Sequence, residues 1–161
     1  MKVVKPLLKI ITNSSEETME FGEKIAKILK PNSVVALSGQ LGSGKTTLVK
    51  GIAAGLGIPR EQVISPSFTL IREYQGKKLA LFHCDLYRLD NLDQIAFLGL
   101  DDYFNQGGVL VIEWAKKAAG LLPEDFINIE INRMSREKRT FRISAVGEIC
   151  QRMIGKLKVA S

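Results

Sequence analysis

Residues 39–46 combine glycines, a lysine and a threonine at the spacing of a phosphate-binding loop. The segment reads GQLGSGKT and fits the pattern G-x-x-x-x-G-K-[ST]. Glycines let the backbone approach phosphates closely, so that its N–H groups form an anion-binding nest at the start of a helix. Lys45 is expected to reach the β- and γ-phosphates of a nucleotide, and the Thr46 hydroxyl to bind Mg²⁺. The residues predicted to contact the nucleotide are Gly39, Gln40, Leu41, Gly42, Ser43, Gly44, Lys45, Thr46 and Thr47.

The segments on both sides of the loop fit the context that this motif requires. Residues 33–38 form an apolar run that contains two valines, which is typical of a buried parallel strand. Residues 47–54 follow helical spacing, and Gly55 and Gly57 then end that helix. A glycine-rich turn that binds no ligand would not need a preceding strand and a following helix, so phosphate binding is the favoured interpretation.

Two carboxylates at the ends of predicted strands are candidates for the metal and for the reacting water. Asp85 ends the strand of residues 78–85, and Glu113 ends the strand of residues 109–113. Ligands of open α/β sheets bind outside the carboxyl ends of the strands, beside the phosphate loop. One carboxylate is expected to bind Mg²⁺, directly or through water, and the other to orient the attacking water; the alternative is an exposed strand-end carboxylate. Strand alternation places His83 on the face of Asp85, where a hydrogen-bonded structural role is expected.

Three hydroxyls, those of Ser65, Ser67 and Thr69, lie close together along the chain. They are candidates to sense the γ-phosphate, as switch segments do in nucleotide-driven proteins. The alternative is an ordinary turn, because serine and proline both favour turns.

Length and composition indicate one domain spanning residues 1–161, with 45% hydrophobic residues to form its core. No apolar run approaches the length of a membrane span, and the first residues lack the features of a signal peptide.

Cys84 and Cys150 show no paired spacing, so we expect reduced thiols in a cytoplasmic protein. The single histidine excludes a histidine-rich metal site. The net charge of +6 arises largely late in the chain, as a basic patch for RNA or an acidic partner, or as a solvated face.

The predicted elements alternate between helix and strand. A strand at residues 8–11 precedes a helix that begins after Ser14 and ends before Pro31. This order predicts an α/β fold, a P-loop NTPase-like three-layer sandwich whose sheet is parallel at its centre and antiparallel at its edges. The other predicted elements are hairpins formed by residues 68–85 and 126–144 and helical segments at residues 91–104, 114–119 and 147–157.

Four sequence blocks together resemble one family. They are GQLGSGKTT at residues 39–47, SPSFT at residues 65–69, HCDLYRL at residues 83–89 and VIEWA at residues 111–115. In this order and spacing they resemble the TsaE family, also called YjeE, the small bacterial ATPases of tRNA threonylcarbamoyladenosine (t⁶A) synthesis. Many families share the phosphate loop, whereas its combination with the H-x-D-x-Y-R and E-W blocks is far more specific.

The resemblance implies slow hydrolysis of ATP with Mg²⁺, and action on the TsaB–TsaD pair, in which TsaD transfers the threonylcarbamoyl group to adenosine 37 of tRNA. TsaB and TsaD are the implied protein partners, tRNA is a candidate partner of the assembled complex, and no membrane is implied. The implied roles are Lys45 as the phosphate lysine, Thr46 and Glu113 as the magnesium site, Asp85 as the catalytic carboxylate and residues 65–69 as a switch-like segment.

Three other function classes share part of these features. A small-molecule kinase shares the loop, but it needs an acceptor pocket, often with a lid that carries arginines, and here the arginines cluster late in the chain. A non-enzymatic switch would use the bound nucleotide only to control docking. A basic RNA-binding module would interleave aromatic residues with its cations, and the late basic region lacks them.

Overall fold

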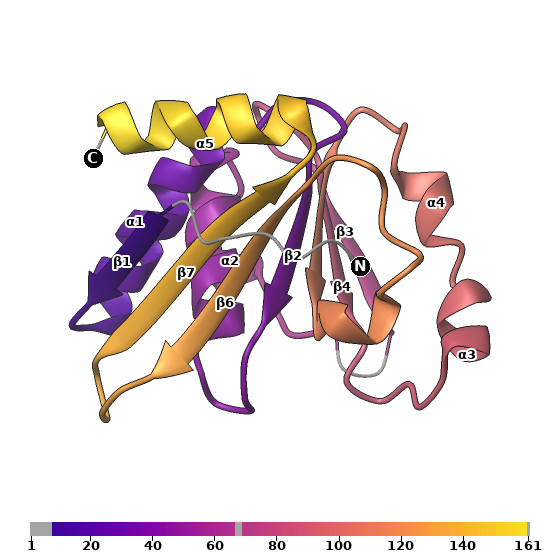
Figure 1. Ribbon diagram of the computed structural model, residues 1–161, viewed down its shortest axis with the longest axis horizontal. Helices are drawn as coiled ribbons and strands as arrows, with labels where there is room; N and C mark the ends of the chain where they lie inside the picture. The colour runs from indigo at the N-terminus through magenta and orange to yellow at the C-terminus, as the bar shows by residue number, and fades with distance from the viewer. Residues whose placement is uncertain (1–7, 67–68, 161) are drawn as a thin grey trace.

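The computed structural model describes residues 8–66 and 69–160, and for residues 158–160 the backbone alone. Strands and helices alternate along most of these residues (Figure 1). The strands are β1 (Leu8–Thr12), β2 (Val34–Ser38), β3 (Ile71–Tyr74), β4 (Leu81–Asp85), β5 (Val109–Glu113), β6 (Phe126–Arg133) and β7 (Arg139–Val146). The helices are α1 (Ser15–Ile28), α2 (Lys45–Gly55), α3 (Leu92–Ala96), α4 (Leu100–Tyr103) and α5 (Glu148–Ala160), with 3₁₀ helices η1 (Arg60–Gln62) and η2 (Ala115–Ala118).

The strands of the described residues form one sheet in the order β1-β7-β6-β2-β5-β4-β3. β6, β2, β5 and β4 are parallel neighbours at the centre, whereas β1, β7 and β3 pair antiparallel towards the two edges. The predicted α/β class, with a parallel centre and antiparallel edges, is therefore confirmed. The register places Asp85 of β4 beside Glu113 of β5, so the two strand-end carboxylates are neighbours at one edge of the sheet.

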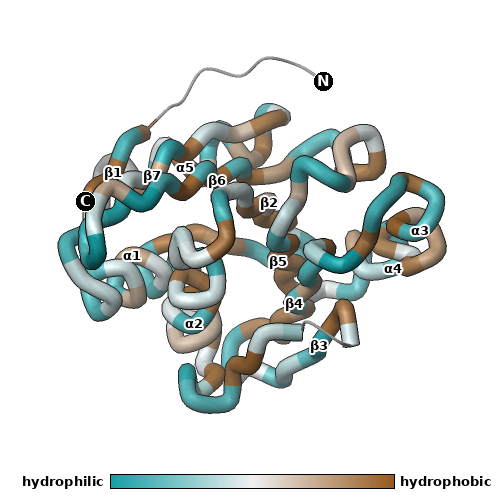
Figure 2. The backbone as a smooth tube through the Cα atoms, turned by 90° about the horizontal axis from the view of Figure 1, so that it is seen from below, coloured by the Kyte–Doolittle hydropathy of each residue, from teal (hydrophilic) through white to brown (hydrophobic). Residues whose placement is uncertain are grey.

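Helices cover the two faces of the sheet and complete three layers (Figure 2). α1, α2 and α5 pack on one face, where Val35 and Phe141 belong to the core. α3, α4 and η2 pack on the other face, next to Val34 and Ile112. Because successive residues of β2 alternate between the two clusters, this strand is buried on both faces, as a continuous apolar run predicts.

α1 and α2 lie in close contact because glycines replace side chains where the helices meet. A Cβ atom on Gly51 would lie 2.2 Å from the carbonyl oxygen of Met19, and Gly22 of α1 approaches α2 in the same way. α1 begins after Ser14, whose hydroxyl accepts a hydrogen bond from the N–H of Glu17, as the predicted cap requires. This contact holds α2, and with it the phosphate loop, on the sheet.

Some predicted elements differ from the structure for local reasons. The strand predicted at residues 68–74 begins only at Ile71 within the described residues 69–74, because Leu70 has a left-handed φ of 67° that a strand excludes, and residue 68 lies outside the described residues. The helical segment predicted at residues 91–104 is two helices, α3 and α4, separated at Gly99. Trp114, predicted to begin a helix, has a φ of 60°, and η2 starts only after it.

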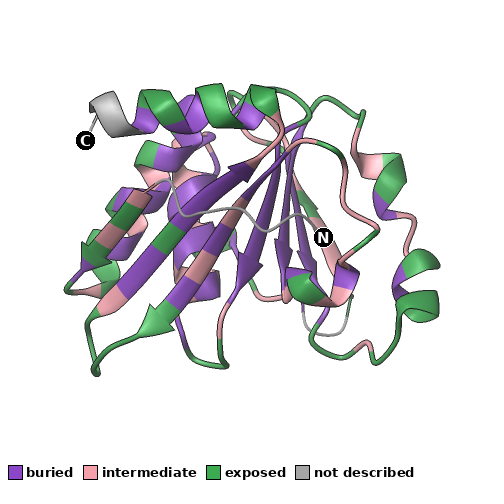
Figure 3. Cartoon of the chain, in the orientation of Figure 1, coloured by how far each residue is buried: buried purple, intermediate pink, exposed green. Residues whose placement is uncertain are grey.

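Burial divides the sheet into two halves (Figure 3). β2, β4 and β5 are buried along their whole length, whereas β6 and β7 carry exposed and half-buried residues. α1, α2 and α5 cover one face of β1, β7 and β6. The other face of these three strands has little helical cover among the described residues (Figure 1). None of the described helices is long and apolar enough to cross a membrane.

Candidate functional site

The predicted phosphate loop joins the end of β2 to the start of α2. β2 ends at Ser38, and α2 begins at Lys45 with Gly44 as its N-cap residue. Gly44 has a φ of 108°, in the left-handed region that favours glycine. The loop and the first turn of α2 border a cavity. The N–H groups of that turn have no partners within the helix, which makes it suited to an anion.

Lys45 is buried, and polar and aromatic groups surround its ammonium. Nζ donates hydrogen bonds to the carbonyl oxygens of Gly39 (2.7 Å) and Gln40 (2.9 Å) and to Ser43 Oγ (3.3 Å). Nζ also lies 4.3 Å from the centre of the Trp114 ring, a cation–π contact. Burial lowers the pKa of Lys45, and two nearby carboxylates oppose that shift. The loop therefore presents its cation from a partly desolvated position, where it acts strongly on a phosphate.

Glu113 connects the loop to the interior of the sheet. The Thr46 hydroxyl donates to its carboxylate, with Oγ1 at 3.3 Å from each oxygen. On the other side, His83 Nε2 lies 2.5 Å from Glu113 Oε2. His83 is fully buried, and its Nδ1 has no hydrogen-bond partner among the described residues. The two contacts fix the Glu113 side chain at the carboxyl end of β5 with oxygens directed towards Thr46.

Asp85 is the second carboxylate at this edge of the sheet. Its Oδ1 accepts a hydrogen bond from the N–H of Tyr87 (2.9 Å). Burial raises the pKa of the Asp85 carboxyl above its usual range; the Tyr87 N–H opposes the shift and the neighbouring Glu113 adds to it. A carboxylate with a raised pKa is a better proton acceptor than an exposed one, which suits a group that orients or activates water.

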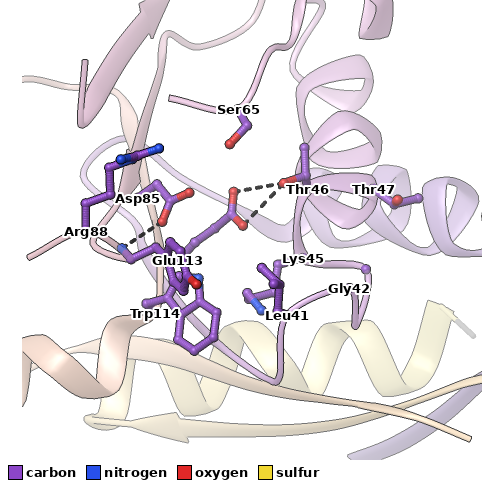
Figure 4. A pocket seen from close by; sticks show the side chains of 12 residues that line it. Leu41, Gly42, Lys45, Thr46, Thr47, Ser65, Asp85, Arg88, Glu113 and Trp114 are labelled. Atoms are coloured by element: carbon purple, nitrogen blue, oxygen red, sulfur yellow. Dashed lines mark hydrogen bonds between the residues drawn. The ribbon is translucent and has the colours of Figure 1, made fainter. Parts of the chain in front are cut away.

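One cavity of about 310 Å³ brings the loop and both carboxylates together (Figure 4). Figure 4 shows the side chains of Asp85 and Glu113 directed into the space beside Thr46, with Trp114 across from them against Lys45. Of the predicted residues, those that line this cavity are Leu41, Gly42, Gly44, Lys45, Thr46, Thr47, Ser65, Asp85 and Glu113.

The remaining predicted residues lie elsewhere. Gly39, Gln40 and Ser43 do not line the cavity but hold Lys45 from behind through the contacts given above. Thr69 is exposed and does not line it either. Ser67 falls outside the described residues. Of the predicted switch-like segment, the structure thus brings Ser65 to the cavity.

Four further residues shape the site and were not predicted to do so. Arg139 of β7 donates from Nε to the carbonyl oxygen of Ser43 (2.8 Å), and so ties the loop to the hairpin. The Trp114 ring packs against the Tyr87 ring, with the ring centres 5.1 Å apart and the planes tilted by 41°, and Lys117 donates to the carbonyl oxygen of Tyr87. Trp114 entered the sequence analysis only as part of the VIEWA block and of the helical segment predicted at residues 114–119, and the left-handed backbone that places it against Lys45 has no signal in the local pattern.

The donor set fits Mg²⁺ that arrives with a nucleotide. Thr46 and Glu113 supply hard oxygen ligands, and Mg²⁺ is usually bound by one or two carboxylates, with phosphates and waters at the other positions. Within residues 8–66 and 69–160, His, Cys, Asp and Glu side chains form no group of three that could hold a metal ion alone.

A family model decides the relationship that the geometry suggests. The model for "Threonylcarbamoyl adenosine biosynthesis protein TsaE" matches residues 12–141. The chain belongs to the TsaE family. The resemblance inferred from four sequence blocks is thereby confirmed.

Individual TsaE relatives agree over most of the chain. The tRNA threonylcarbamoyladenosine biosynthesis protein TsaE of Bacillus subtilis is 44% identical over 140 residues, which cover 87% of each chain. The TsaE of Treponema pallidum is 36% identical over 137 residues, covering 85% of this chain and 100% of the relative. The crystal structure of Bacillus subtilis YdiB superimposes with a TM-score of 0.83 at 38% identity and covers 99% of both chains. This TsaE-family chain therefore shares its fold with YdiB along nearly its entire length.

Proposed function

We propose that this chain is a single-domain, Mg²⁺-dependent ATPase that serves t⁶A modification of tRNA. The observation that supports the proposal most is a convergence of residues from separate elements. Lys45 and Thr46 come from the loop, Asp85 from β4 and Glu113 from β5, and all four line one cavity. Cation, hydroxyl and two carboxylates are the groups that phosphoryl transfer to water requires.

The loop residues bind and neutralise the phosphates. Lys45 and the start of α2 line the cavity, where the positive end of the helix and the lysine charge favour a polyanion. Mg²⁺ held by Thr46 and Glu113 would supply charge neutralisation between the phosphates. Glu113 is kept in place for this by His83, which lies buried behind it.

Asp85 acts on the water. It lies beside Glu113 in the register of the sheet but outside the loop that supplies most phosphate contacts. Burial raises the pKa of Asp85, which makes its carboxylate a stronger proton acceptor than an exposed one. We therefore propose that Asp85 orients the attacking water and that Glu113 holds the metal.

The biological role follows from the family. The relatives are named for t⁶A biosynthesis, and the chain is similar to them over most of its length. We infer that its ATPase activity acts on the TsaB–TsaD pair in the cytoplasm, with ATP and Mg²⁺ as cofactors, and that it resets this pair between turnovers. Pull-down of TsaB and TsaD, with and without ATP, tests the partner assignment.

Phosphate release from ATP, measured with the purified chain and then with TsaB and TsaD added, separates the ATPase from its alternatives. The ATPase releases phosphate without an added acceptor and stops when Mg²⁺ is chelated. A small-molecule kinase would release phosphate only slowly and respond to an acceptor. A non-enzymatic switch would bind ATP and release no phosphate even when TsaB and TsaD are present.

A further inference from the structure

The face of β1, β7 and β6 that has little helical cover adjoins the back of the phosphate loop. Two cavities of about 400 Å³ and about 280 Å³ lie there and share Gln40 and Asn132 as lining residues. We call the two together the open-face groove. Gln40 belongs to the phosphate loop, and Trp114 lines both the second of these cavities and the nucleotide cavity. The groove therefore runs from β1 to the wall of the proposed ATPase site.

Cations dominate the groove, and several of them have no partner in the part of the chain that the structure describes. Lys9 of β1 stands directly opposite Arg142 of β7, and like charges in that position destabilise a sheet. Glu130 also stands opposite Arg142, yet no ion pair joins the two. Among the described residues, the side chains of Lys9, Lys116 and Arg142 make no hydrogen bond or ion pair. The cations that line the groove are Lys9, Lys116, Lys117, Arg133 and Arg142.

The groove also holds an unpartnered hydroxyl. Ser38 is 4% exposed, and its Oγ is buried without a hydrogen-bond partner although Ser38 lines the second cavity. Buried polar atoms nearly always have a partner, so this hydroxyl beside the groove has hydrogen-bonding capacity that the described residues leave unused. Asn132 and Thr140 add uncharged polar groups along the same surface.

We propose that the open-face groove binds the sugar–phosphate backbone of RNA. Lysine, arginine, asparagine, serine and threonine are the side chains that make most contacts to phosphate and sugar. Glu130 is the one acid that lines the groove, and it can accept a hydrogen bond from a ribose 2′-hydroxyl, which DNA lacks. The shortage of aromatic residues argues against base stacking and is compatible with backbone binding.

An acidic protein partner fits these residues less well. Protein interfaces depend on central aromatic anchors set in apolar pockets. In the groove Trp114 stands at one end only, and its ring is already engaged by Lys45 and Tyr87. The choice of RNA over another polyanion rests on the proposed role in t⁶A modification.

Fluorescence anisotropy with a labelled RNA stem–loop tests the groove on the full chain. We expect binding that weakens with salt, because each neutralised phosphate releases counterions. Replacing Lys9 and Arg142 together by Ala is expected to weaken binding several-fold. The same variant should flatten the plot of log affinity against log salt by about 2, since each lost phosphate contact lowers that slope by about 1.

The matched control is Lys27→Ala with Lys30→Ala, which removes two exposed cations at the end of α1 and changes net charge equally. This control should bind the RNA like the wild type. An equal loss in both double variants would show a non-specific charge effect and overturn the proposal. Absence of RNA binding at low salt would also overturn the proposal. If polyglutamate displaced the RNA as effectively as unlabelled RNA does, the groove would be assigned to an acidic protein instead.

Phosphate release by the same wild-type preparation keeps this proposal separate from the ATPase. RNA binding without phosphate release would contradict the proposed ATPase and support the groove. Phosphate release without RNA binding would support the ATPase and contradict the groove. Thermal denaturation of each double variant checks that a loss of binding does not come from unfolding.

Discussion

Ionisable side chains at the carboxyl ends of β2, β4 and β5 differ from those on the uncovered face of β1, β7 and β6 in burial and in the number of partners they have. At the strand ends, Lys45, Asp85, Glu113 and His83 are all buried, and each has a hydrogen-bond partner: the loop for Lys45, Tyr87 for Asp85, and each other for Glu113 and His83. On the β1–β7–β6 face, Lys9 and Arg142 are exposed and have no partners within residues 8–66 and 69–160, although both lie in the same sheet.

The difference follows from how each half of the sheet is built. Parallel strands are covered on both faces, so their ends form a partly desolvated site in which each charge needs a partner. The antiparallel pair β6–β7 with edge strand β1 needs cover on one face only. Its other face can keep cations exposed to solvent, where dissolved salt screens them over about 8–10 Å and where together they attract a large polyanion. The predictions below test this contrast.

The largest effect is expected from Lys45→Ala. Without the ammonium, no buried cation of the loop neutralises the negative charge of the phosphates. We therefore expect the rate of ATP hydrolysis to fall by about 100-fold or more. The matched control is Lys27→Ala, which removes an exposed lysine on α1 and should leave the rate unchanged. Wild-type nucleotide affinity and rate in Lys45→Ala would remove the loop from the mechanism.

Next in size is a stability effect behind the buried site. Gly51→Ala places a Cβ 2.2 Å from the Met19 carbonyl oxygen, which forces α1 and α2 apart at a cost of roughly 1–3 kcal/mol. Gly155→Ala in α5 is the control: nothing lies within 4 Å of its Cβ, and better helix propensity should add about 0.5–1 kcal/mol. Urea denaturation measures both free energies of unfolding. Equal effects would show that the contact between α1 and α2 is not tight.

A smaller effect is expected at the proposed magnesium ligands. Thr46 Oγ1 lies 3.3 Å from each carboxylate oxygen of Glu113. Thr46→Ala removes the hydroxyl oxygen, and Glu113→Gln replaces one carboxylate oxygen by an amide nitrogen. Because contacts to charged groups contribute about 1.5 kcal/mol or more, the Mg²⁺ concentration for half-maximal hydrolysis should rise about tenfold or more. Magnesium titrations that match the wild type in both variants would place the metal elsewhere.

The smallest effect concerns pH and the stability of the chain without nucleotide. Burial raises the pKa of Asp85, so the folded state favours the protonated carboxyl and loses stability as pH rises through the carboxyl range. Asp85→Asn removes the buried charge and should raise the thermal midpoint at pH 7. Below about pH 4, where the carboxyl is protonated in both states, the difference should vanish. A midpoint that is lowered at pH 7 would mean that the carboxylate stabilises the fold.

Local sequence patterns were sufficient for the parts of the site that lie within one element. The loop around Lys45 and the strand ends at Asp85 and Glu113 could be predicted because glycine spacing and strand length act over a few residues. The position of β7 between β1 and β6 could not, because strand order depends on packing across the whole chain.

Contacts between distant elements likewise had no signal in the sequence. Arg139 of β7 donates a hydrogen bond to Ser43, and His83 of β4 contacts Glu113 of the neighbouring strand. An arginine or a histidine in a strand does not indicate which distant residue it will contact. The left-handed backbone at Trp114 is the clearest case. A bulky residue disfavours that conformation, so only the completed fold reveals that its ring packs on Lys45.

The central claim, that Asp85 acts on water in an ATPase site, is tested most directly by binding and hydrolysis in one preparation of Asp85→Asn. Trp114 is the only tryptophan and lies against Lys45 at the cavity, so its fluorescence reports nucleotide binding, while phosphate release reports turnover. We expect ATP affinity close to that of the wild type and hydrolysis reduced by about 100-fold or more, the signature of a group that acts in the transition state. Hydrolysis at the wild-type rate would contradict the account, and a loss of affinity as large as the loss of rate would make Asp85 a binding residue.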